Sequence, residues 1–102
     1  MPLNVTAQPA PCGALVRGLD LRQPLDGDTL AALRRAWLAH QVLAIVDQAL
    51  TLEDLERFAL AIGPYGQDPY FESVPGHPHV AQVKREADET STIFADNFHS
   101  DW

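Results

Sequence analysis

A histidine and an aspartate stand two residues apart near the end of the sequence, in the run His99-Ser100-Asp101. On a β-strand, residues i and i+2 point to the same face, so the imidazole and the carboxylate would project together. They are two of the three ligands of the 2-His-1-carboxylate triad, which holds Fe(II) and leaves positions open for a co-substrate and dioxygen. Spacing alone favours a surface histidine beside a solvated carboxylate, so the surrounding sequence has to decide between the two interpretations.

Other reactive side chains have simpler interpretations. His77 and His79 flank a proline in a predicted turn, and we interpret them as two surface histidines rather than a shared metal site. Cys12 lies between a proline and a glycine with no base nearby, which favours a packing role over a nucleophilic one. Residues 86–89 are mostly acidic but lack the spacing and central glycine of a calcium loop, so we expect a solvated turn.

Length and charge exclude several classes of protein. The chain has 102 residues, 14 of them acidic and 7 basic, with a formal net charge of −7. This length allows one small domain, and an acidic chain without a Lys/Arg cluster is a poor partner for nucleic acid or anionic membranes.

The single cysteine favours a reducing compartment, and the first residues lack a secretory signal. The longest apolar run, Val42–Val46, is far short of the roughly 20 residues of a membrane-spanning helix. We therefore expect a cytoplasmic protein.

The hydrophobic pattern predicts a mixed α+β fold. An edge strand is expected over Leu3–Ala7 and a second strand over Ala14–Leu21, followed by a helix over Thr29–His40. The run Val42–Val46 is apolar at every position, which is typical of a strand covered on both faces. A second helix is expected to begin at Thr51, whose spacing from an acidic residue three positions later approximates a capping box.

Both predicted helices carry an apolar stripe, and we assign the stripe of the first helix to the core. The stripe of the first helix consists of Leu30, Leu33, Trp37 and Leu38. The stripe of the second helix consists of Leu52, Leu55, Phe58, Ala59 and Ile62. Gly63-Pro64 is expected to end the second helix in the manner of a C′ glycine followed by proline.

The rest of the chain is less regular. Prolines are frequent over Pro64–His79, which predicts a long irregular loop of the kind that binds ligands. A strand is expected over Val80–Lys84 and a charged turn over Arg85–Thr90.

The order of motifs resembles the taurine dioxygenase/TfdA-like family of Fe(II)- and 2-oxoglutarate-dependent dioxygenases. Gly13–Leu25 follows the pattern G-x-x-V-x-G-x-D-L-x-x-P-L, and the next strand ends near Asp47-Gln48. The helix pattern L-T-x-E-x-L-x-x-F-A and its G-P stop come next. The aromatic-His-x-Asp motif comes last, with Phe98 where tryptophan is more usual.

The resemblance implies that residues 1–102 are the N-terminal part of a double-stranded β-helix, or jelly roll, with flanking helices. His99 and Asp101 would be the first two iron ligands, with no catalytic residue beyond the metal ligands. The second histidine and the arginine that binds 2-oxoglutarate lie on later strands of the family, and nothing follows Trp102 here. The implied reaction hydroxylates a small organic substrate with dioxygen and converts 2-oxoglutarate to succinate.

The predicted loop and the residue before the motif supply candidate substrate contacts. In taurine enzymes of the family, a histidine just before a proline helps to hold the sulfonate, and Asp68 stands at the nearest position here. A carboxylate repels an anionic sulfonate, which argues against taurine as the substrate. Tyr70 and Asn97 are the other candidates for the pocket.

Because the chain offers only two of the three ligands, we expect the 102-residue chain to bind metal weakly and exchangeably and to show no turnover. Two alternatives stay open. In the first, the chain is a non-catalytic interaction module or gene remnant of this family, and its open strand edges favour a homo-oligomer. In the second, it is one part of a site that a second polypeptide completes.

Overall fold

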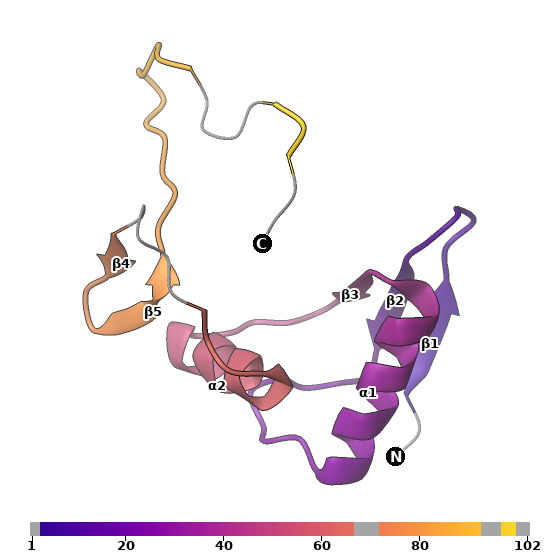
Figure 1. Ribbon diagram of the computed structural model, residues 1–102. Helices are drawn as coiled ribbons and strands as arrows, with labels where there is room; N and C mark the ends of the chain where they lie inside the picture. Colours follow the sequence, from indigo (N-terminus) through magenta and orange to yellow (C-terminus); the bar gives the residue numbers. More distant parts are fainter. Residues whose placement is uncertain (1–2, 67–71, 93–96, 100–102) are drawn as a thin grey trace. The chain divides into compact units, whose positions relative to one another are not determined.

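The computed structural model describes residues 3–66, 72–92 and 97–99. The chain divides into two compact units, residues 1–66 and 67–102, and each is described by itself (Figure 1). The first unit is a mixed α+β structure, as predicted, with two helices and a small sheet. The second unit contains a two-stranded hairpin within its described residues.

The sheet of the first unit has three strands in the order β1-β2-β3, where β1 is Asn4–Ala7, β2 is Ala14–Arg17 and β3 is Leu43–Ile45. β1 and β2 pair antiparallel, whereas β2 and β3 pair parallel. A parallel pair needs a crossover, and helix α1 lies in the chain between its two strands (Figure 1).

Helix α1, Gly27–His40, begins and ends at residues that satisfy its terminal backbone groups. The side chain of Asp26 accepts a hydrogen bond of 2.7 Å from the Thr29 N–H. At the other end Gln41 adopts a φ of 71°, and its N–H donates to the Trp37 carbonyl at 2.7 Å. The helix therefore begins two residues earlier than the sequence predicted and ends at the expected residue.

Helix α2, Leu52–Ile62, begins with the predicted capping box. The Asp54 N–H donates to the Thr51 hydroxyl at 3.2 Å, and the Thr51 N–H donates to the Asp54 carboxylate at 3.1 Å. Gly63 ends the helix as expected, but its φ of −176° is extended. The chain therefore leaves the helix directly into extended backbone before Pro64.

Gln48 joins the end of the sheet to the loop that follows β2. Its Oε1 accepts a hydrogen bond from the Leu21 N–H at 3.0 Å. Its Nε2 donates to the Leu19 carbonyl at 2.7 Å and to the Val46 carbonyl at 2.9 Å. Arg57 of α2 also donates to the Leu21 carbonyl, at 3.3 Å. These bonds fix the loop between β2 and α1 against the chain that leads into α2.

The core of the described residues is small. Its buried hydrophobic side chains are Ala14, Val16, Leu21 and Leu33. The prediction that the whole stripe of α1 is core is wrong, since Trp37 is 48% exposed and Leu38 is 83% exposed. The prediction of a fully covered strand is also wrong, because β3 lies at the sheet edge and Ala44 is exposed. Within residues 3–66 these side chains therefore face solvent.

The second unit contains a β-hairpin in part of the region that the sequence predicted to be an irregular loop. Strands β4, Ser73–Val74, and β5, His77–Ala81, pair antiparallel around a turn in which Gly76 has a φ of 81°. A positive φ suits glycine because it has no Cβ. The predicted strand over Val80–Lys84 is therefore shifted toward the N-terminus. Across the described ranges, no helix is long and apolar enough to cross a membrane.

Substitutions of two leucines on α1 test the limits of this core. Leu33 is 2% exposed and Leu38 is 83% exposed. We expect Leu33→Ala to lower the free energy of unfolding by about 2–5 kcal/mol, because a buried side chain leaves a cavity. Leu38→Ala on the same helix should change it by less than about 0.5 kcal/mol. Urea denaturation measures both, and equal losses would contradict the described burial.

The helix caps predict how stability depends on pH. The pKa of Asp26 is lowered by the backbone N–H of Thr29, and the pKa of Asp54 is lowered by the backbone N–H of Thr51. A lowered pKa in the folded state stabilises the fold above the ordinary carboxyl value, and this stability is lost as the pH falls through the folded value. Melting temperatures should therefore fall below about pH 4. The double variant Asp26→Asn, Asp54→Asn should show a shallower fall, and an unchanged slope would refute this role.

Candidate functional site

His99 is held by the backbone two residues before it. Its Nδ1 lies 2.8 Å from the Asn97 carbonyl oxygen. Because a carbonyl oxygen can only accept, a hydrogen bond here requires the proton on Nδ1. In a neutral imidazole the lone pair then lies on Nε2, the atom that would bind a metal. A histidine that donates its second N–H to a carbonyl is a common arrangement among metal ligands.

The other predicted site residues are only partly described. Asp101 lies outside the described residues, and so do Asp68 and Tyr70. Asn97 is exposed, and the structure uses its carbonyl rather than its side chain to orient His99. The structure therefore brings Asn97 and His99 together, and the roles of the remaining three residues stay predictions.

A complete metal centre is not formed by the residues that the structure describes. Among them no group of three His, Cys, Asp or Glu side chains could hold a metal ion. His77 and His79 are spaced by two residues on β5, with His77 half-buried and His79 exposed. The interpretation of the two as surface histidines stays a prediction for half-buried His77.

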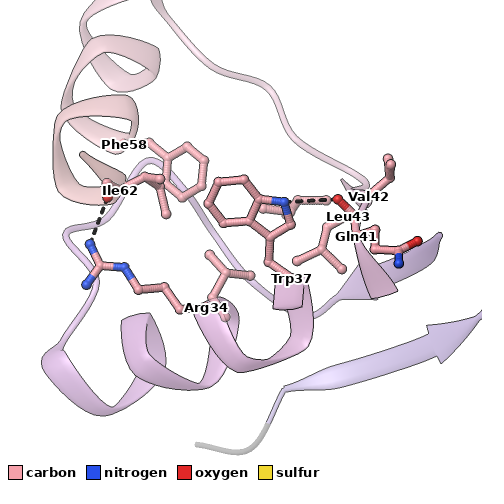
Figure 2. Close-up of a pocket in the computed structure, with 9 residues that line it drawn as sticks. Arg34, Trp37, Gln41, Val42, Leu43, Phe58 and Ile62 are labelled. Carbon is pink, nitrogen blue, oxygen red and sulfur yellow. Dashed lines mark hydrogen bonds between the residues drawn. The ribbon is translucent and has the colours of Figure 1, made fainter. Parts of the chain in front are cut away.

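The first unit contains a different concave surface, an apolar groove of about 340 Å³. Leu33 and Trp37 of α1, Phe58 and Ile62 of α2, and Leu43 and Ile45 of β3 line it, together with Arg34, Gln41 and Val42 (Figure 2). The helical pairs are four residues apart and the strand pair is two apart, so each pair lies on one face of its element. Three elements therefore turn aligned apolar pairs toward one space.

Hydrogen bonds from two side chains hold the walls of the groove in place. The Trp37 indole Nε1 donates to the Gln41 carbonyl at 3.0 Å, which fixes the ring beside the end of α1 (Figure 2). The Arg34 guanidinium donates to the Ile62 carbonyl at 2.7 Å and to the Ala61 carbonyl at 3.2 Å. This arginine joins α1 to the C-terminal end of α2, so its charge is satisfied by backbone oxygens.

Sequence reasoning missed the groove and also missed the role of Gln48. The aligned pairs were visible as stripes, but periodicity shows which face is apolar and not what covers it. Exposure of Trp37 and Val42, at 48% and 58%, becomes visible only when the neighbouring elements are placed. For Gln48 the available signal was its place shortly after a predicted strand, where an amide can bond several backbone groups.

Comparison with known proteins shows which family the chain belongs to. The sequence model of the family described as "Taurine catabolism dioxygenase TauD, TfdA family" matches residues 4–102. The match includes the first unit, the hairpin and the His99 motif.

Solved structures agree with this match. A taurine dioxygenase from Burkholderia xenovorans is 32% identical, with a TM-score of 0.72, over 83% of this chain and 32% of its own. A second protein of that organism, assigned as an alpha-ketoglutarate-dependent taurine dioxygenase, is 33% identical with a TM-score of 0.71, over 81% of this chain and 32% of its own. AAD-2, solved with Mn(II) and N-oxalylglycine, is 30% identical with a TM-score of 0.61, over 65% of this chain and 24% of its own. The chain thus spans about a third or less of the length of these structures.

Proposed function

The chain belongs to the TauD/TfdA family of dioxygenases, and from this premise we propose that it supplies two ligands of an Fe(II)- and 2-oxoglutarate-dependent active site. The ligands are His99 and Asp101, and the reaction is the hydroxylation of a small organic molecule. The complete fold would be a jelly roll of which this chain forms the N-terminal part.

The orientation of His99 is the observation that carries the proposal. Its Nδ1 contact with the Asn97 carbonyl leaves the ring lone pair on Nε2. The same contact limits rotation of the ring, so the chain itself sets both the tautomer and the direction of the ligand. His99 itself is exposed, so this local contact and the motif support the proposal, and burial does not.

The donor types fit a divalent metal of this class. An imidazole and a carboxylate are two members of the 2-His-1-carboxylate set typical of non-haem Fe(II). N-oxalylglycine, present with Mn(II) in AAD-2, carries the adjacent carboxylate and carbonyl oxygens that 2-oxoglutarate also has. When bound, Fe(II) and 2-oxoglutarate would supply the oxidation of the substrate, and this chain would position the metal and contribute to the pocket.

We propose that the pocket disfavours anionic sulfonates. Asp68 would place a carboxylate where taurine enzymes of the family hold a histidine, and like charges repel. Tyr70 and Asn97 would contribute an aromatic face and an amide to the same pocket. A neutral or cationic organic substrate fits this set better than taurine does.

The 102-residue chain should bind Mn(II) weakly at His99. We expect Mn(II) to broaden the imidazole NMR signals of His99 selectively, because the paramagnetic ion would bind its Nε2. The four histidines of the chain provide internal controls. His99→Ala should abolish the effect on the remaining signals near it, whereas His79→Ala should not. Broadening confined to His77 and His79 would refute the assignment.

A full-length enzyme tests the catalytic role. The matched region of the Burkholderia xenovorans taurine dioxygenase can be replaced by this chain, which joins it to the remaining two thirds of a family member. In that protein His99→Ala or Asp101→Ala should lower succinate formation by more than about 100-fold with little loss of fold. His79→Ala serves as the matched control. Full activity of the His99→Ala protein would contradict the proposal, as would succinate formation by the 102-residue chain alone.

A further inference from the structure

A second concave surface of the first unit lies between the ends of β1 and β2 and the loop that leads into α1. Its volume is about 490 Å³, and we call it the loop pocket. Gly18, with a φ of 85°, turns the chain at the end of β2. The Gln23 N–H then donates to the Asp20 carbonyl at 3.1 Å, and Asp26 and Thr29 line the pocket where α1 begins. Pockets for small ligands have volumes of about 300–1,000 Å³.

The loop pocket combines apolar and polar side chains. Leu3, Leu19 and Leu25 line it and are half-buried. Arg17 and Asn4 also line it, and both are exposed. These two residues stand directly opposite each other in the antiparallel register of β1 and β2. Side chains of such a pair share one face of the sheet, with Cβ atoms about 5 Å apart. A guanidinium and an amide therefore lie together beside three leucines.

The guanidinium of Arg17 is not engaged within the described part of the chain. Its side chain forms no hydrogen bond or ion pair with another described residue. The carboxylates that line the pocket do have partners. Arg22 donates to both oxygens of Asp20, at 3.0 and 2.9 Å, and Asp26 accepts from the Thr29 N–H at 2.7 Å. The N–H groups of Arg17 are therefore available to a ligand.

A carboxylate is the ligand group that fits this set best. The planar guanidinium of arginine binds a carboxylate through two parallel hydrogen bonds, and the Asn4 amide can donate a third. Asp26 and the net charge of −7 disfavour a dianion such as a phosphate ester. The half-buried leucines favour an apolar group attached to the carboxylate.

We propose that the loop pocket binds a small organic monocarboxylate. Arg17 and Asn4 would hold its carboxylate, and Leu3, Leu19 and Leu25 would contact its apolar chain. This binding site goes beyond the proposed function, because no residue of the iron assignment enters the argument.

Titration of the 102-residue chain with sodium hexanoate tests the proposal. We expect saturable NMR shifts of the Arg17 Nε–H and of the Asn4 side-chain amide, because both groups would donate to the carboxylate. Hexanol has the same chain without the charge, and inorganic phosphate has charge without the chain. Each should bind at least about tenfold more weakly than hexanoate.

Three substitutions separate the pocket from the general charge of the protein. Arg17→Gln should weaken hexanoate binding by at least about tenfold. Arg17→Lys should weaken it less, because lysine keeps the charge but loses the planar pair of donors. Arg35→Gln is the matched control, since Arg35 is an exposed arginine of α1 that does not line the pocket. Circular dichroism shows whether each variant keeps its helices.

Several outcomes would overturn the proposal. Absence of saturable shifts up to about 50 mM hexanoate would leave no binding site. Equal weakening by Arg17→Gln and Arg35→Gln in folded variants would mean general attraction to cations. Equal binding of hexanol would assign the pocket to apolar molecules, and equal binding of phosphate would assign it to inorganic anions. None of these measurements depends on Mn(II) or on turnover, so this proposal and the metal assignment can fail separately.

Discussion

The parallel pairing of β2 with β3 determines the arrangement of residues 3–66. Because parallel strands need a crossover, α1 must leave the end of β2 and return the chain to the start of β3. Gln48 then bonds the loop after β2 to the chain after β3, and Arg57 bonds the same loop from α2. The two helices and the strand are thus held in the positions that form the groove, with Val16 fully buried beneath them.

This arrangement also explains why the chain exposes so much apolar surface. Covering the stripes of both helices takes more layers than three short strands can provide. Leu33 and Trp37 both line the groove, but Leu33 is buried whereas Trp37, one turn later, is half-exposed.

Much of the local structure could be predicted from the sequence. Asp26, Thr51 and Asp54 mark helix starts through side-chain bonds to nearby backbone, which depend on a few adjacent residues. Burial could not be predicted in the same way, because it depends on elements far along the chain. Leu38 and Ala44 therefore looked like core residues and are exposed. For the site, a sequence motif was enough to select His99 as a candidate ligand, but its contact with the Asn97 carbonyl is visible only in the structure. Asp101, Asp68 and Tyr70 stay predictions.

Amide hydrogen exchange at β3 tests the central claim most directly. The account predicts that the Ala44 amide, which faces β2, exchanges slowly in the 102-residue chain, whereas the Leu43 and Ile45 amides, which face away from β2, exchange rapidly. Equal exchange rates of the three amides would contradict the parallel pairing of β2 with β3.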